Sequence, residues 1–243
     1  MRNMKDLSKV KAIFFDIDNT LIDFMKMKER AIEVAVEAMI DAGLPLSKEE
    51  AKKEIYKIYE EKGMEYQKVF NDLLLKVLGK IDYKVLAAGV VAYRRVKEGY
   101  VRPYPGVTYT LIELRKRGYK LCVISDAPAF QVWSRLAGMN LHHYFDEVIT
   151  FDESQIKKPH ELPFKIALEK LNLKAEEVLM VGDDPQRDIK GAKKLGIITV
   201  LAKYGQIFPV DEADREQIPD YAIDDVRELL KLLPSKNLSS QHH

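Results

Sequence analysis

Short apolar runs alternate with segments of helical periodicity over most of the chain. The apolar runs stand at residues 11–15, 119–124, 147–151, 177–181 and 197–201. After residue 106, apolar positions recur every three to four residues at 107–118, 128–138, 161–171 and 185–195. Continuous apolar strands that alternate with helices are typical of a mostly parallel sheet covered on both faces. The pattern therefore predicts an α/β protein with a Rossmann-like core.

A different pattern separates the first apolar run from the second. From Phe24 to about Gly99 no strand pattern occurs, and helical periodicity is found at 25–42, 47–62, 64–79 and 82–98. The prolines and glycine of "RPYPG" at 102–106 cannot continue a helix, so they mark the return to the core. We expect two domains: a catalytic core made of residues 1–22 and 103–243, and an inserted helical domain, residues 23–102.

Composition narrows the classes of function. Lys and Arg number 39 against 38 for Asp and Glu, so no net field favours nucleic acid or an anionic membrane as a partner. The longest apolar run, "VLAAGVVAY", is shorter than the roughly 18 residues that span a bilayer. The single cysteine, Cys122, lies inside an apolar run and suits the reducing cytoplasm as a buried, inert thiol. The oligomeric state is not indicated. The polar C-terminal segment, with His242 and His243, is not expected to be a metal site.

Polar side chains follow the carboxyl ends of four predicted strands. These residues are Asp16 and Asp18, then Ser125, then Lys157 and Lys158, and finally Asp183, Asp184 and Asp188. In a parallel sheet such ends share one edge, where ligands bind. Carboxylates that crowd together raise each other's pKa unless a divalent cation stabilises them. Because all the ligands are oxygen atoms, the sequence predicts Mg²⁺ at this edge.

Four sequence motifs resemble those of a known family. "DIDNTL", the serine that closes "CVIS", "KKP" and "GDDPQRD" are similar, in order and spacing, to the four motifs of the haloacid dehalogenase-like superfamily. They cover the core from residue 11 to about 200. The helical segment between the first and second motifs resembles the cap domain of this family. The resemblance implies a Mg²⁺-dependent phosphotransfer enzyme that closes over a small phosphorylated substrate.

The two aspartates of the first motif divide the chemistry between them. The resemblance makes Asp16 the nucleophile, and attack of a carboxylate on phosphorus gives an acyl phosphate that water can cleave. Asp18 returns to the same face of an extended chain, where it is placed to protonate the leaving alkoxide and then to deprotonate water. Within the family a second aspartate is the mark of phosphatases and phosphomutases, and dehalogenases lack it.

The other motifs supply substrate and metal contacts. The resemblance implies that Ser125 donates its hydroxyl to a phosphate oxygen. Lys158 matches the lysine of the third motif better than Lys157 does, and its charge would hold the nucleophile and the phosphoryl group together. Asp183 would complete the Mg²⁺ shell with the side chain of Asp16 and the backbone carbonyl of Asp18.

Three further aspartates have less defined roles. Asp126 stands where the family often has Asn. It directly follows Ser125 and is therefore a candidate for substrate binding. We nevertheless expect it to be the N-cap of the helix that contains Pro128. Asp184 precedes a proline and is expected to cap the next helix. Asp188 lies one turn further on, and we expect it to contact the metal through water or to orient Lys158.

Three functions are compatible with these residues. The first is a phosphatase for a small metabolite, such as a triose or sugar phosphate; the chain also resembles archaeal family members that include glyceraldehyde 3-phosphate phosphatases. A phosphomutase would use the same first step but return the phosphoryl group to its substrate. A non-catalytic binding protein could keep the fold alone, although the presence of all four of Asp16, Asp18, Lys158 and Asp183 favours an enzyme.

Overall fold

The computed structural model describes residues 5–235 of the chain, so His242 and His243 lie outside the described residues. These residues form two compact units. Residues 24–101 make the second unit, and the described residues before 24 and after 101 make the first. None of the helices in residues 5–235 combines the length and apolar character that a bilayer crossing requires.

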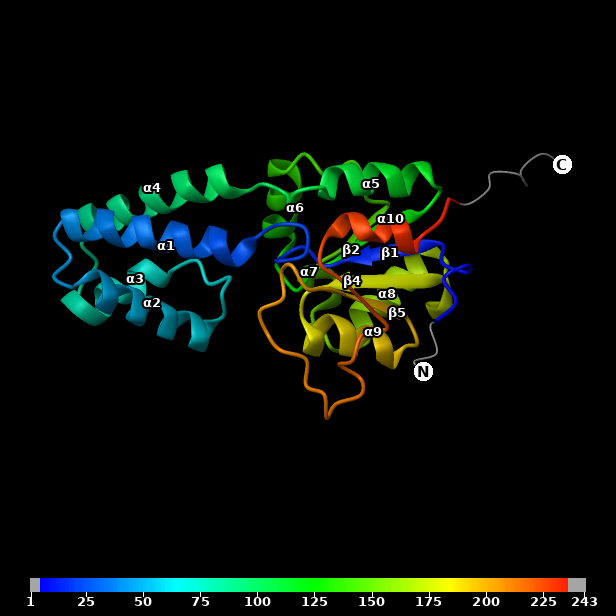
Figure 1. Ribbon diagram of the computed structural model, residues 1–243. Helices are drawn as coiled ribbons and strands as arrows, with labels where there is room; N and C mark the ends of the chain where they lie inside the picture. The colour runs from blue at the N-terminus through cyan, green and yellow to red at the C-terminus, as the bar shows by residue number, and fades with distance from the viewer. Residues whose placement is uncertain (1–4, 236–243) are drawn as a thin grey trace. The chain divides into compact units, whose positions relative to one another are not determined.

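A parallel six-stranded sheet is the framework of the first unit (Figure 1). Its strands are β1 (Ala12–Phe15), β2 (Lys120–Ile124), β3 (Glu147–Ile149), β4 (Val178–Gly182), β5 (Ile198–Ala202) and β6 (Tyr221–Ile223). They lie in the order β3-β2-β1-β4-β5-β6, so β1 pairs with β2 on one side and with β4 on the other. The register sets Phe15 opposite both Val123 and Val181. The chain therefore leaves β1, β2 and β4 at one edge, which we call the carboxyl edge.

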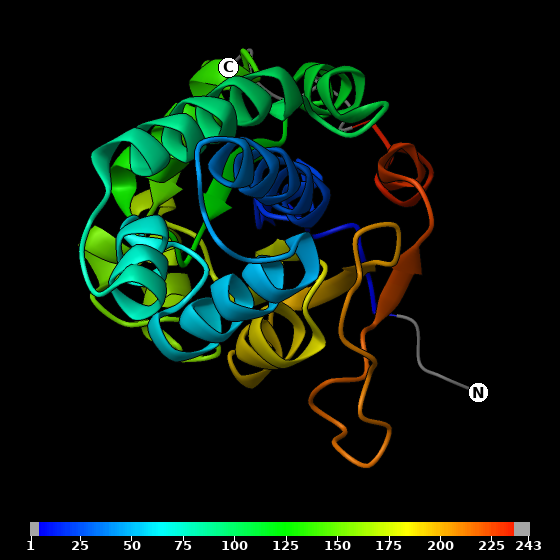
Figure 2. The same cartoon turned by 90° about the vertical axis from the view of Figure 1, so that its left-hand side faces the viewer.

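Helices cover both faces of this sheet. They are α5 (Val107–Lys116), α6 (Ala129–Gly138), α7 (Phe151–Ser154), α8 (Leu162–Leu171), α9 (Lys190–Lys194) and α10 (Leu229–Leu232), with short turns η1 (Ala175–Glu177), η2 (Pro185–Ile189) and η3 (Val226–Glu228). From α8 and α9, Phe164 and Ala192 join Phe14 in one buried apolar cluster. Alternate residues of β1, such as Ile13, are equally buried on the opposite face, on the side of α5 and α10 (Figure 1, Figure 2).

The predicted α/β fold class is confirmed, with differences at short elements. β6, α7 and α10 have three or four residues each and were not predicted, because a period cannot be recognised over so few positions. The strand expected at 147–151 ends at Ile149, and Phe151 already begins α7. The helix expected at 185–195 is divided into a π-helical turn, η2, and the short helix α9.

The second unit is entirely helical. It consists of α1 (Phe24–Asp41), α2 (Lys48–Lys62), α3 (Val69–Leu78) and α4 (Tyr83–Tyr100), which enclose an apolar core of their own. The helix expected at 64–79 begins only at Val69. Lys28, which is buried, donates from Nζ to the carbonyl of Met64 at 2.8 Å and lies 4.2 Å from the ring centre of Tyr59. This contact joins the segment before α3 to α1. The role of the unit as a cap stays a prediction.

Candidate active site

A buried lysine stands at the centre of the carboxyl edge. Nζ of Lys158 contacts Oδ1 of Asp16 at 2.6 Å and Oδ1 of Asp188 at 2.6 Å, and it donates to the carbonyl of Ile124 at 3.0 Å. Only 1% of the Lys158 side chain is exposed, whereas Lys157 is exposed. Three distant segments thus meet at one ammonium group. Of the two candidate lysines, Lys158 is the one that joins the predicted site.

Three buried carboxylates surround a common space beside this lysine. Asp16, Asp183 and Asp188 each offer one oxygen, and these oxygens lie within 4.8 Å of one another. Burial raises the pKa of Asp16 to about 7, although Lys158 opposes the shift, and the charges of Asp188 and Asp18 add to it. Burial also raises the pKa of Asp183 to about 9, with the charges of Asp188 and Asp16 as further causes. An all-oxygen, electron-rich group of this kind fits a divalent cation such as Mg²⁺.

The ammonium group of Lys158 stays charged in these surroundings. Burial by itself would lower the pKa of Lys158, but the charges of Asp16 and Asp188 outweigh it and raise the pKa above the ordinary value. A buried cation is stable only when such partners are close. Lys158 therefore supplies a fixed positive charge at the carboxyl edge.

Two residues at the end of β4 determine the local structure of the site: Gly182 and the helix cap Asp184. A Cβ atom on Gly182 would lie 2.3 Å from Oδ2 of Asp188, so a glycine is needed for this carboxylate to approach. The same Oδ2 accepts from the amide of Asp184 at 3.1 Å. Asp184 is the N-cap of η2, as expected: its Oδ1 accepts from the amides of Gln186 and Arg187, each at 2.9 Å.

Asp18 and Ser125 lie at the same edge but outside the group of three carboxylates. Oδ2 of Asp18 lies 3.1 Å from a guanidinium nitrogen of Arg135, whose side chain is buried in α6. Ser125 directly follows β2 and is 5% exposed. Its hydroxyl oxygen accepts from the amide of Ala127 at 3.2 Å, so its hydroxyl proton remains to be donated elsewhere. Arg135 thus adds a cation to the set that the sequence identified.

The predicted capping role of Asp126 is wrong. Helix α6 begins at Ala129, and the amide of Ala129 donates to Oδ2 of Asp152 at 2.5 Å. An N-cap side chain must stand next to the first helical residue, and Asp126 lies three positions earlier. Its Oδ1 instead accepts from the backbone amide of Lys158 at 2.9 Å, and its Oδ2 lies 3.4 Å from Arg187. Asp126 therefore supports the loop that carries the lysine.

Sequence reasoning assigned no role to Thr20 or Arg135. Thr20 is fully buried, and its hydroxyl donates to Oδ1 of Asp183 at 3.2 Å. Because Thr20 belongs to the motif "DIDNTL", the sequence could have identified it as a candidate site residue. Arg135 is a single charge in an amphipathic segment, where a charged side chain is normally read as solvent-facing. No pattern distinguished it.

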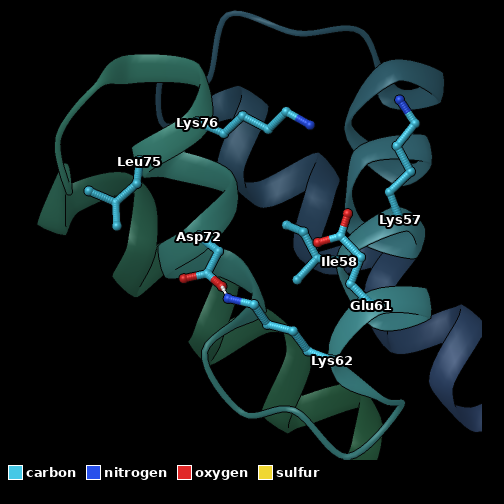
Figure 3. Close-up of a pocket in the computed structure, with 7 residues that line it drawn as sticks. All are labelled: Lys57, Ile58, Glu61, Lys62, Asp72, Leu75 and Lys76. Carbon is cyan, nitrogen blue, oxygen red and sulfur yellow. Dashed lines mark hydrogen bonds and ion pairs between the residues drawn. The ribbon is translucent and has the colours of Figure 1, made fainter.

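A separate hollow lies in the second unit, between α2 and α3. Its lining is mainly charged and contains none of the predicted site residues (Figure 3). Lys62 and Asp72 form an ion pair across it at 2.5 Å, and Lys57 and Lys76 both pair with Glu54. Because its lysines are already paired with carboxylates, we assign this hollow no part in the chemistry.

The fold and the four strand ends can be compared with known proteins. The haloacid dehalogenase-like hydrolase family matches residues 10–196. The chain belongs to this family. A Methanocaldococcus jannaschii protein named glyceraldehyde 3-phosphate phosphatase is 42% identical to this hydrolase over 229 residues, which are 94% of this chain and 98% of that protein. A Pyrococcus furiosus protein of the same name is 37% identical and covers 97% of this chain and 98% of its own.

Solved structures show the same fold. A HAD phosphatase from Thermococcus onnurineus has a TM-score of 0.63 at 25% identity, with 93% of this chain and 99% of that chain covered. A 2-haloacid dehalogenase from Pseudomonas syringae has a TM-score of 0.61 at 24% identity, with 92% and 97% covered. The dehalogenase shows the fold alone. Together with the archaeal relatives, these findings confirm the predicted enzyme class, a phosphoric monoester hydrolase of the haloacid dehalogenase-like family.

In the absence of a metal ion, the free energy of unfolding should fall as the pH rises from about 4 to 9. The carboxyls of Asp16 and Asp183 have ordinary pKa values of 3.8, and burial raises these pKa values to about 7 and about 9 in the folded chain. A carboxyl group whose pKa is higher in the folded chain than in the unfolded chain stabilises the folded chain. This contribution is complete below the unfolded-state pKa and is lost as the pH rises through the folded-state pKa. Mg²⁺ should reverse the loss.

Thermal unfolding with chelator or with Mg²⁺ checks this expectation. At a hundredfold excess over its Kd, Mg²⁺ should raise the Tm by about 5–10 °C near neutral pH. The rise should be larger at high pH than at low pH, and Asp183→Asn should flatten the dependence. A Tm that stays constant with pH in chelator and does not respond to Mg²⁺ would contradict this account of the carboxylates.

Two substitutions of Asp126 separate its hydrogen bond from its charge. Asp126→Ala removes the acceptor for the amide of Lys158 and should lower the free energy of unfolding by about 1 kcal/mol. Asp126→Asn keeps an oxygen acceptor and loses only the half-exposed ion pair with Arg187, so it should cost less than about 0.5 kcal/mol. Denaturant unfolding measures both values. If both variants lose the same free energy of unfolding, Asp126 does not stabilise the protein through this hydrogen bond.

Proposed function

We propose that the chain is a Mg²⁺-dependent phosphatase that hydrolyses a small phosphorylated metabolite through an aspartyl-phosphate on Asp16. One observation supports this most: Nζ of Lys158 lies 2.6 Å from Asp16, next to the group of three buried carboxylates. A nucleophilic carboxylate needs positive charge around it before it can meet an anionic phosphate. The lysine supplies part of this charge.

The residues that would hold the metal ion follow from the same geometry. The side chains of Asp16 and Asp183 would hold Mg²⁺, and Asp188 offers a further oxygen. The family resemblance adds the backbone carbonyl of Asp18 as a ligand. When bound, the ion supplies charge that lets the phosphate approach the carboxylate. Thr20 would keep the carboxylate of Asp183 oriented through the hydrogen bond at 3.2 Å.

The first chemical step transfers the phosphoryl group to the protein. A carboxylate oxygen of Asp16 forms a bond to phosphorus while the bond from phosphorus to the ester oxygen breaks. Asp18 gives its proton to the leaving alkoxide. The ammonium group of Lys158 and the hydroxyl of Ser125 hold the phosphoryl oxygens during the transfer. Asp188 keeps Lys158 in place for this role, at 2.6 Å.

The second step returns the nucleophile. Water attacks the phosphorus of the aspartyl-phosphate, and Asp18 accepts the proton that water loses. The bond between Asp16 and phosphorus breaks, and inorganic phosphate leaves. The contact of Asp18 with Arg135 holds the carboxylate of the proton shuttle at the site.

The substrate we propose is a triose or sugar phosphate, with glyceraldehyde 3-phosphate first among the candidates. This proposal is supported by the relatives of that name, which match this chain over nearly its full length. The helical unit, residues 24–101, would act as the cap that excludes water and selects the substrate. The lone, buried Cys122 is in keeping with an enzyme of the cytoplasm.

Release of phosphate from a panel of phosphomonoesters tests the proposal. Activity should require Mg²⁺ and be highest on a triose phosphate. Asp16→Asn should abolish it, and Asp18→Asn should lower kcat by about 10²–10⁴-fold because proton transfer is lost. Asp41→Asn, at an exposed position that ends α1, is the matched control and should behave as the unsubstituted enzyme.

Two outcomes would contradict the proposal. The first is phosphate release that persists with excess chelator or in Asp16→Asn. The second is conversion of a phosphate ester to its isomer without free phosphate, which would identify a phosphomutase instead.

A further inference from the structure

The loop that follows β1, residues 17–22, links the first motif to the metal-binding group. It turns back on itself, because the amide of Asn19 donates to the carbonyl of Ile22 at 2.7 Å while Asn19 has a positive φ of 60°. The next residue, Thr20, is fully buried and donates its hydroxyl to Oδ1 of Asp183. The position of this turn therefore decides where the hydroxyl of Thr20 points.

A tyrosine from a distant segment is fastened to this turn. The hydroxyl of Tyr204, just beyond β5, donates to the backbone carbonyl of Thr20 at 2.9 Å. The ring of Tyr204 meets the ring of Tyr104 edge to face, with centroids 5.1 Å apart. The amide of Tyr104 in turn donates to the carbonyl of Leu21 at 2.8 Å. Two tyrosines in contact thus hold consecutive residues of the turn.

The next residue, Gly205, brings the two backbones together. A Cβ atom at this position would lie 1.5 Å from the carbonyl oxygen of Asn19. Such an approach is possible only for glycine, and the obstacle is a backbone atom that cannot rotate away. The segment after β5 therefore packs directly against the turn after β1.

We propose that Tyr204 and Gly205 are positioning residues for the metal site. They fix the turn at Asn19 and Thr20, so that the hydroxyl of Thr20 holds the carboxylate of Asp183 in the orientation that binds the cation. Partners of this kind affect metal affinity by about 10–100-fold when they touch a ligand directly. Tyr204 acts one step further away, so we expect a smaller effect, about 3–10-fold in the Kd. The inference rests on the proposed function, since that function requires the metal ion.

Calorimetric titration of the substrate-free protein with Mg²⁺ tests the role of Tyr204. Tyr204→Phe keeps the ring and removes the hydroxyl, and it should raise the Kd for Mg²⁺ by about 3–10-fold. The matched control is Tyr119→Phe. Tyr119 also donates its hydroxyl to a backbone carbonyl, that of Pro234 at 2.8 Å, but it stands before the other end of β2. Tyr119→Phe should leave the Kd for Mg²⁺ unchanged. This should hold even if Tyr119→Phe lowers the Tm in chelator as much as Tyr204→Phe does.

A double-mutant cycle shows whether Tyr204 acts through Thr20. Thr20→Val removes the hydroxyl that contacts Asp183 and should raise the Kd by about 10-fold or more. Addition of Tyr204→Phe to Thr20→Val should then change the Kd no further, because the interaction that it supports is already absent. Independent, multiplying effects on the Kd would overturn the inference.

The remaining outcomes separate the inference from the proposed function. If the unsubstituted protein binds Mg²⁺ and Tyr204→Phe binds it equally well, the inference is overturned and the proposed function stands. If the unsubstituted protein binds no Mg²⁺, both are overturned.

Discussion

Charge balance among four buried side chains is the constraint on which the site depends. Three carboxylates, those of Asp16, Asp183 and Asp188, share a space with one ammonium group, that of Lys158. One positive charge cannot stabilise three negative charges away from water. Burial raises the pKa values of Asp16 and Asp183, and the charges of the neighbouring carboxylates add to this rise. A divalent cation would balance the group. The same arrangement would draw an anionic phosphate to the nucleophile once the cation is bound.

The fold makes this balance possible by joining segments that are far apart in the chain. Parallel pairing of β1 with β2 and β4 puts their carboxyl ends at one edge, where Asp16 and Asp183 follow directly. Asp188 then reaches the same space from η2, because Gly182 leaves room for its carboxylate. The sheet thus fixes where β1 and β4 end, and the loop of Lys158 and the turn η2 bring the remaining side chains to the same place. Such an arrangement is expected where geometry has to be held closely.

Much of this could be predicted because it follows from repeated patterns. Apolar runs followed by polar residues are recognisable one strand at a time, and the parallel arrangement then brings Asp16, Ser125 and Asp183 to one edge. The choice of Lys158 over Lys157 came from family resemblance and agrees with their burial. Contacts between single residues could not be predicted in this way. The hydrogen bond from Tyr204 to the carbonyl of Thr20 joins positions 184 residues apart and leaves no periodic trace. The capping role of Asp126 failed for a related reason, since a cap depends on the first residue of the helix, and helix ends are poorly marked.

In the proposed mechanism Asp16 carries the phosphoryl group during turnover, and trapping of this intermediate is the most direct test. The Mg²⁺-loaded enzyme would be mixed with substrate, quenched in acid within a single turnover, and digested for mass spectrometry. We expect one phosphoryl group on the peptide that contains Asp16, located on that residue and formed before free phosphate accumulates. Phosphate release without a phosphorylated Asp16 at any time, together with inversion of configuration at phosphorus, would show direct attack by water and contradict the account.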